Sequence, residues 1–358
     1  MKEYLRLKNF WKNKKVFITG HTGFKGSWLC IFLNLMGSRV YGYSNNEKHS
    51  NYLFRKANLK KIIQKSINGD IRDYKKLKKN IHQIKPDVLI HFAAQSLVRK
   101  SYAEPVNTYD VNVMGTVNIL DILNEVKTIK SSLIITTDKV YYNDNKKKLF
   151  KETDVLGGND PYGNSKSCAD IISNFYIQNI YKSRKSVAIV RSGNIIGGGD
   201  YAEDRIIPDY IRALKKNQSL KIRIPKAIRP WQHVVEPLYG YLLLSEQLYK
   251  DKSGNCSGAW NFGPNKGNND TVIKMIKKFN SCFKNRVKLL IFKKSNKFYE
   301  SKILMLDSSK AQKKLSWKSI ISLNNAVKLT ADWYLNVLNK KKPLDVSRQQ
   351  ILNYLKNI

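Results

Sequence analysis

Residues 16–27 read VFITGHTGFKGS, an apolar run followed by three glycines at a spacing of three. The run Val16–Thr19 predicts a buried strand, and the stretch Ser27–Met36 predicts a helix. The glycines that allow a tight turn between them are Gly20, Gly23 and Gly26. A strand, a glycine turn and a helix N-terminus form a site for the pyrophosphate of a dinucleotide. Glycine triplets also occur in ordinary turns, so the flanking strand and helix are what favour this interpretation.

Short β-rich runs alternate with helical stretches through about the first 195 residues. The predicted strands span 16–19, 39–43, 65–68, 88–92, 133–136 and 187–190. The predicted helices span 27–36, 111–126 and 162–180. This alternation predicts an α/β fold with a Rossmann-like, doubly wound parallel sheet. Ligands then bind beyond the carboxyl ends of the strands.

The pattern changes after Arg191, where the glycine-rich loop 193–199 begins and the alternation of strands and helices weakens. We predict a dinucleotide-binding domain that is followed by a smaller, mixed C-terminal lobe for the substrate. The first domain covers 1–192 with a returning segment at about 232–262, and the lobe covers 193–231 and 263–358.

Length and composition favour one large domain with a smaller lobe, or two domains. The chain has 358 residues, and an apolar fraction of 42% is sufficient for a packed core. No apolar run approaches the roughly 20 residues of a membrane span. Residues 1–15 are charged and lack the apolar core of a signal peptide. We therefore expect a cytoplasmic protein without a membrane partner.

The net charge of +38 raises the possibility of a nucleic-acid partner. The lysines are spread along the whole chain, and no helix-turn-helix, zinc finger or aromatic nucleic-acid module organises them. Solvated lysine-rich faces are the better interpretation, so we expect no dedicated nucleic-acid partner. The four cysteines are far apart and form no C-x-x-C pair, which predicts neither a disulfide nor a metal site.

Tyr162 and Lys166 form a Y-x-x-x-K pattern at the start of a predicted helix. Positions i and i+4 share one helix face, so the amine can lie near the phenol. A nearby cation stabilises the phenolate and is expected to lower the pKa of Tyr162, which would make it a base near neutral pH. An incidental Tyr and Lys is the alternative. The location of the pair, a strand and a loop beyond Thr137, favours catalysis.

Thr137, Asp138 and Lys139 follow the apolar strand that ends at Thr136. A hydroxyl, a carboxyl and an amine in a row beyond a strand suit proton transfers around a substrate, although a plain loop can also carry them. Asp70, after another strand, is placed to meet an adenine amino group, with a solvated turn as the alternative.

The second predicted strand ends at Tyr43-Ser44 without the acidic residue that binds a ribose 2′-hydroxyl. The choice between NAD and NADP is therefore open on local chemistry.

The chain resembles the extended short-chain dehydrogenases and, within them, the CDP-glucose 4,6-dehydratases. The resemblance covers about residues 10–334 and is most specific in four parts of the sequence. These are VFITGHTGFKGSWL, AAQSLVRKSYAEPVNTYDVNVMGTVN, TTDKVY with DPYGNSKSCAD, and RSGNIIGGGDYAEDRIIPDYIRA with AIRPWQHVVEPLYGYL. It implies tightly held NAD, a CDP-hexose substrate, a homodimer built through a four-helix bundle, and a role in deoxysugars of surface polysaccharides such as O-antigen.

The same resemblance implies roles for individual residues. The cofactor-binding residues are Gly20, Thr22, Gly23, Phe24, Gly26, Asp70, Ile71, Ala93, Ala94, Gln95, Tyr162 and Lys166. The substrate-binding residues are Asn194, Arg205 and Arg229. The catalytic residues are Thr137, Asp138, Lys139, Tyr162 and Lys166. No metal is implied.

The implied reaction removes water from the sugar. Tyr162 takes the proton of the 4-hydroxyl while C4 gives a hydride to NAD, and Asp138 protonates the departing 6-hydroxyl as C5 loses its proton. The hydride then returns to C6. Lys139 stands where the dTDP-glucose relatives have a glutamate that acts as the C5 base. Because a lysine is a base only when neutral, positioning of the substrate is its alternative role.

Other functions share part of this pattern. A 4,6-dehydratase for another nucleotide sugar and a nucleotide-sugar 4-epimerase would have the same fold, although an epimerase has no use for the acid Asp138. A non-catalytic dinucleotide- or RNA-binding protein would have no reason to keep Thr137, Tyr162 and Lys166 together. The choice of CDP depends on the resemblance alone.

Overall fold

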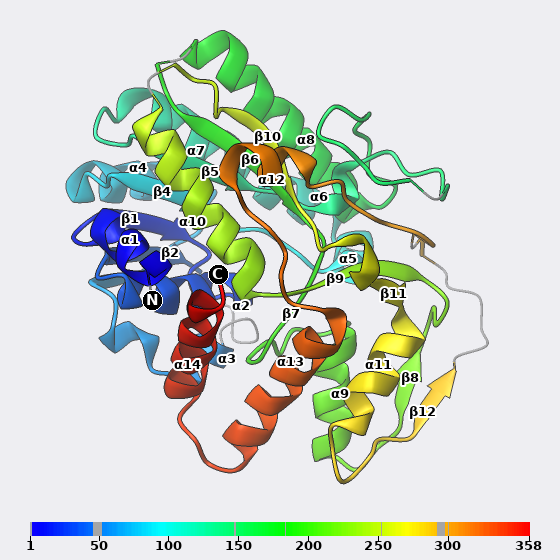
Figure 1. Ribbon diagram of the computed structural model, residues 1–358. Helices are drawn as coiled ribbons and strands as arrows, with labels where there is room; N and C mark the ends of the chain where they lie inside the picture. Colours follow the sequence, from blue (N-terminus) through cyan, green and yellow to red (C-terminus); the bar gives the residue numbers. More distant parts are fainter. Residues whose placement is uncertain are drawn as a thin grey trace.

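The computed structural model describes residues 2–45, 52–146, 148–182, 184–251, 253–291, 298–299 and 301–358. A large sheet with helices on both faces makes up one part of the molecule, and short strands with α9, α11 and α13 make up the other (Figure 1). Among the described residues, none of the helices combines the length and apolar character that crossing a membrane requires.

The large sheet has seven parallel strands in the order β10-β6-β5-β4-β1-β2-β3. The strands are β1 (Lys15–Thr19), β2 (Arg39–Ser44), β3 (Lys65–Asn68), β4 (Val88–His91), β5 (Ser131–Ile135), β6 (Val187–Ser192) and β10 (Gly258–Phe262). The prediction of a doubly wound parallel sheet is confirmed. The strand order reverses between β1 and β4, which is where such sheets bind their ligands.

Both faces of the central strands β1, β4, β5 and β6 are buried, which explains why these strands read as nearly continuous apolar runs. Along β1, Val16 and Ile18 belong to a core that includes α2 (Phe24–Leu35) and α10 (Val235–Lys250). Phe17 points to the opposite face and packs in a second core with α4 (Tyr74–Ile84) and α7 (Gly115–Glu125).

The remaining helices surround the large sheet and build the smaller part. They are α1 (Lys2–Trp11), α3 (Tyr52–Lys56), α5 (Val98–Ala103), α6 (Pro105–Tyr109), α8 (Pro161–Phe175), α9 (Ile206–Lys215), α11 (Val272–Ser281), α12 (Ser309–Leu315), α13 (Leu323–Leu338) and α14 (Pro343–Lys356). Helices α1 and α14, from opposite ends of the chain, pack against each other (Figure 1).

The smaller part contains a mixed three-stranded sheet and a parallel strand pair. Its strands are β7 (Asn194–Ile196), β8 (Leu220–Ile222), β9 (Ile228–His233), β11 (Asn269–Thr271) and β12 (Leu289–Ile291). After β9 the chain returns to the large sheet, where α10 contacts β5 and β6 and β10 pairs with β6.

The helices differ from their predicted limits in two ways. Helix α2 begins at Phe24 rather than Ser27, because Gly23 has the extended backbone of an N-cap (φ −68°, ψ 172°) and the first turn follows directly. The predicted helices 111–126 and 162–180 each include a π-helical turn, one before α7 at Asp110–Met114 and one after α8 at Tyr176–Tyr181.

Candidate active site

A cleft of about 970 Å³ opens beyond the carboxyl ends of β1, β4, β5 and β6 and extends to the smaller part of the molecule. All residues for which the sequence predicts a cofactor, substrate or catalytic role line this cleft. Segments that are far apart in the sequence, among them the glycine turn, the start of α8 and β9, therefore face one space. Their individual roles stay predictions.

The glycine turn shapes the wall of the cleft next to β1. Gly20 has φ +71°, and a Cβ there would lie 2.7 Å from the backbone nitrogen of Ala93. A Cβ on Gly26 would lie 2.3 Å from the carbonyl oxygen of Gly20. The turn can pack this closely only without side chains, and it leaves the first N–H groups of α2 without intrahelical partners at the cleft. These residues fit a pyrophosphate, which such N–H groups bind.

Asp70 lies after β3 and is paired with Arg72. The Arg72 Nη2 donates to Asp70 Oδ2 at 2.7 Å and the Arg72 Nε donates to Oδ1 at 2.9 Å. The hydrogen bond from Arg72 lowers the pKa of Asp70. The carboxylate is partly exposed and has lone pairs left for an amino group of a ligand.

Lys166 and Tyr162 lie on one face of α8, as predicted, but burial changes their protonation. Lys166 Nζ donates to the carbonyl oxygen of Ile135 at 2.9 Å, and burial lowers the pKa of Lys166 to about 7. Burial raises the pKa of Tyr162 to about 12, and this outweighs the lowering by Thr137 and Arg205. The prediction of a lowered Tyr162 pKa is wrong, because removal of the phenolate from water is the larger effect.

Asp138 is a buried acid with one oxygen unpaired. Its Oδ1 accepts a hydrogen bond from Thr137 Oγ1 at 3.0 Å, and its Oδ2 has no hydrogen-bond partner among the described residues. Burial raises the pKa of Asp138 to about 6, although Lys139 opposes this shift. A carboxyl group that is partly protonated near neutral pH can donate a proton to a ligand in the cleft.

Lys139 is held by an acid that the sequence analysis did not identify. Its Nζ donates to Asp160 Oδ2 at 2.9 Å, and Asp160 Oδ1 accepts from the backbone N–H of Gly163 as the N-cap of α8. An aspartate directly before Pro161 is an N-cap signal in the sequence, but its contact with Lys139 is not. The ion pair fixes the Lys139 amine beside the start of α8, an arrangement that suits the positioning of a ligand.

Several cations line the side of the cleft that faces the smaller part. Arg205 pairs with Asp200 at 3.0 Å, and Arg229 is buried on β9. Lys25, whose pKa burial lowers to about 8, lines the same cleft and was not predicted as a site residue. With Asn194 on β7, these side chains fit an anionic ligand such as a diphosphate. Over the described ranges, no group of three or more His, Cys, Asp or Glu side chains is placed to hold a metal ion.

Comparison with known proteins identifies sugar-nucleotide enzymes. Residues 17–330 match the family model described as GDP-mannose 4,6 dehydratase. The chain is 39% identical over 354 residues to a CDP-glucose 4,6-dehydratase of Salmonella typhimurium, a match that covers 97% of this chain and 98% of the relative. It is 26% identical over 343 residues to UDP-glucose 4-epimerase 2 of Oryza sativa subsp. japonica, covering 89% and 81%.

Two solved dehydratases have the same fold. A dTDP-glucose 4,6-dehydratase from Bacillus anthracis in complex with NAD matches 92% of this chain and 99% of its own, with a TM-score of 0.74 and 22% identity. DesIV, a dTDP-glucose 4,6-dehydratase from Streptomyces venezuelae with NAD and TYD bound, matches the same shares with a TM-score of 0.76 and 22% identity.

The buried carboxyl of Asp138 predicts a pH-dependent stability. Its folded pKa of about 6 lies above the ordinary value of 3.8, so between these values the folded chain binds more protons than the unfolded chain. The contribution of Asp138 to the free energy of unfolding is therefore most favourable at low pH, and it is lost as the pH rises through about 6. We expect Asp138→Asn to gain free energy of unfolding relative to the unsubstituted protein between about pH 4 and pH 7, by up to about 3 kcal/mol.

Urea unfolding across this pH range measures the difference. Asp144→Asn is the control, because a hydrogen bond from Lys146 lowers the pKa of this exposed acid. Its contribution is lost only as the pH falls below about 4, so the free-energy difference between Asp144→Asn and the unsubstituted protein should stay nearly constant over this range. A free-energy difference for Asp138→Asn that does not change with pH would show that the Asp138 carboxyl is not perturbed.

Proposed function

The chain belongs to the GDP-mannose 4,6-dehydratase family, and on that basis we propose that it is a hydro-lyase that converts CDP-glucose into CDP-4-keto-6-deoxyglucose with bound NAD. The observation that carries the proposal is 39% identity to a CDP-glucose 4,6-dehydratase over 97% of the chain. The common cleft of Thr137, Asp138 and Tyr162 supports it. The product would supply deoxysugars for surface polysaccharides such as O-antigen.

The cleft walls divide between the two ligands. We propose that 1–192 with 232–262 bind the cofactor and that 193–231 with 263–358 bind the nucleotide sugar. When bound, NAD accepts a hydride from the sugar and later returns it. The glycine turn and the first N–H groups of α2 would hold its pyrophosphate, Asp70 its adenine, and Lys166 its ribose. Lys166 uses one N–H group for Ile135, which leaves two for a ligand.

The remaining cofactor contacts are proposed from residues that line the same wall. They are Thr22, Phe24, Ile71, Ala93, Ala94 and Gln95. On the substrate side, Arg229 and Arg205 would neutralise the diphosphate, with Asn194 beside it.

Two side chains would move the protons of the two sugar hydroxyl groups that react. Tyr162, whose pKa the nearby Thr137 and Arg205 lower against the effect of burial, would take the proton of the sugar 4-hydroxyl as C4 is oxidised. Asp138 would protonate the departing 6-hydroxyl through its unpaired Oδ2, for which a pKa of about 6 is suitable. A cleft that excludes water would protect the reduced cofactor during the elimination.

Lys139 is proposed to position the substrate rather than to remove the C5 proton. Its amine is held in an ion pair with Asp160, and Asp160 is itself fixed as the N-cap of α8. The ammonium can then donate a charged hydrogen bond to a hydroxyl of the sugar.

A homodimer is proposed from an apolar surface on α6–α8. The exposed side chains of this surface are Val106, Met114, Ile171 and Phe175. Helix α8 contacts both α6 and α7, so two copies facing each other would bring these helices together in a helical bundle. We also propose a cytoplasmic location.

The test of the function is a substrate panel. The purified protein is incubated with NAD and with CDP-, dTDP- or UDP-glucose, and mass spectrometry measures the loss of water. We expect dehydration of CDP-glucose. Tyr162→Phe should lower kcat by about 10²- to 10⁴-fold because it removes the proton acceptor. Tyr142→Phe, which changes an exposed tyrosine, is the control and should keep kcat.

Other outcomes of the panel contradict the proposal in distinguishable ways. An isomeric product of unchanged mass would identify a 4-epimerase. Dehydration of dTDP- or UDP-glucose but not of CDP-glucose would show that the substrate is a different nucleotide sugar. No turnover of any nucleotide sugar, combined with salt-sensitive RNA binding, would favour the non-catalytic alternative.

Lys139→Met separates the two roles of this residue. If Lys139 only positions the sugar, we expect the KM for CDP-glucose to rise by about 10-fold or more, the effect of losing a charged hydrogen bond. The product made in heavy water should still gain deuterium at C5, as NMR would show. Lys146→Met removes an exposed partner of Asp144 and serves as the control. Reduction of the cofactor without C5 exchange in Lys139→Met would instead identify Lys139 as the C5 base.

A further inference from the structure

Below the cleft, helix α8 and strand β5 are joined by buried polar contacts. Lys166 and Asp170 are four residues apart and so share one face of α8. Lys166 Nζ donates to the carbonyl oxygen of Ile135 at 2.9 Å, and Thr136 Oγ1 donates to Asp170 Oδ2 at 3.2 Å. Two successive turns of the helix are therefore bonded to two successive residues at the end of β5.

The preceding turn of the same face carries Tyr162, which lines the cleft together with Thr137 and whose pKa the Thr137 hydroxyl lowers. Because an α-helix rises about 1.5 Å per residue, Tyr162 and Asp170 are separated by roughly 12 Å along the axis. The position of the phenol thus depends on where α8 lies along the end of β5, and the contacts of Asp170 fix that position from below.

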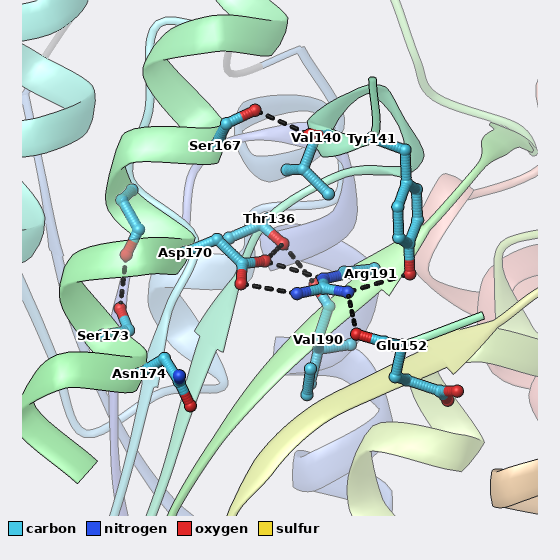
Figure 2. A network of polar contacts seen from close by, with 12 residues as sticks. Thr136, Val140, Tyr141, Glu152, Ser167, Asp170, Ser173, Asn174, Val190 and Arg191 are labelled. Atoms are coloured by element: carbon cyan, nitrogen blue, oxygen red, sulfur yellow. Dashed lines mark hydrogen bonds and ion pairs between the residues drawn. The ribbon is translucent and has the colours of Figure 1, made fainter. Parts of the chain in front are cut away.

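Arg191, at the end of β6, holds the carboxylate of Asp170 (Figure 2). Arg191 Nη2 donates to Asp170 Oδ1 at 2.6 Å, and Nε donates to Oδ2 at 2.8 Å. On its other side, Arg191 Nη1 donates to the Tyr141 hydroxyl at 2.9 Å and to the carbonyl oxygen of Glu152 at 3.0 Å. The two charged side chains are only 3% and 1% exposed, so the pair is enclosed by protein.

An enclosed, two-pronged ion pair tolerates little movement. A shift of α8 by one residue, about 1.5 Å, would break both hydrogen bonds from Arg191 to Asp170 and leave two uncompensated charges in the interior. A buried ion pair adds little net stability compared with apolar residues, but a broken one is strongly unfavourable, so it selects one arrangement. Neither Asp170 nor Arg191 is among the described residues that line the cleft. Neither side chain is therefore placed to touch a substrate.

We propose that Asp170 and Arg191 are positioning residues that fix the register of α8 against the end of β5 and thereby hold the Tyr162 phenol at Thr137 for proton transfer. The kinetic part of this inference rests on the proposed function. Its structural part, the register of α8, does not.

The test uses Arg191→Lys in the full chain, which keeps the positive charge but loses the planar fork. With CDP-glucose that carries hydrogen or deuterium at C4, we expect kcat per folded molecule to fall about 10- to 100-fold, as for misplaced catalytic groups, while KM changes less than about 3-fold. The deuterium effect on kcat should increase, because cleavage of the C4–H bond becomes the slow step. In the protein without substrate, amide hydrogen exchange in α8 should become faster.

Arg6→Lys is the matched control. Arg6 donates through Nη1 to both oxygens of the buried Glu246, at 2.9 Å and 2.8 Å, and this pair joins α1 to α10. It should change neither the kinetics nor the exchange of α8. Tyr141→Phe is a milder variant that removes one acceptor of Arg191, so it should move kcat and the isotope effect in the same direction even if Arg191→Lys does not fold.

The outcomes separate this inference from the proposed function. The inference would be overturned if Arg191→Lys matched Arg6→Lys in three measurements: the isotope effect, the ratio of kcat to KM, and the amide exchange of α8. The pair of Asp170 and Arg191 would then be only structural. If the unsubstituted protein dehydrates no nucleotide sugar, the proposed function fails. The register of α8 is then tested by amide hydrogen exchange alone. Unchanged protection of α8 in both Arg191→Lys and Tyr141→Phe would overturn the inference.

Discussion

Helix α8 carries charged groups to a buried edge of the sheet, where an unpaired charge is strongly unfavourable. Lys166 is satisfied by the carbonyl of Ile135, Asp170 by Arg191, and Asp160 by the amine of Lys139. Each contact joins α8 to a segment at the carboxyl ends of the strands. Because all three must be made at once, the helix has one position, and that position brings Tyr162 to Thr137.

Burial has opposite effects on acids and amines, and the cleft contains both. It raises the pKa of Asp138 to about 6 and lowers the pKa of Lys166 to about 7 and that of Lys25 to about 8. One physical cause therefore brings a carboxyl and two amines close to neutral pH. The same burial raises the pKa of Tyr162, so a phenolate there depends on help from neighbouring groups such as Arg205 and Thr137.

The parts of the molecule that are predictable from the sequence are those with local signals. The apolar runs of the long strands and the glycines of the turn at Gly20 and Gly26 are sufficient to predict the parallel sheet and its ligand-binding edge. The three-residue strands of the smaller part, such as β7 and β8, carry too few residues for a pattern. The bidentate contact of Asp170 with Arg191 joins residues from a helix and a strand, and no spacing rule connects them.

The pKa of Tyr162 shows a second limit. The spacing of Tyr162 and Lys166 correctly predicts that both lie on one helix face, but it carries no sign that the amine bonds to Ile135. It also carries no sign of how much water the fold removes from the phenol. Desolvation depends on residues from many segments, so its magnitude appears only once the cleft is assembled.

The central claim is that this cleft takes a hydride from C4 of a CDP-sugar and returns it to C6 of the same molecule. The most direct measurement mixes CDP-glucose deuterated at C4 with unlabelled CDP-glucose and locates the deuterium in the product by NMR and mass spectrometry. The account predicts one deuterium at C6 of the molecules that began with it at C4. Deuterium lost to water, or found in molecules that began unlabelled, would contradict it.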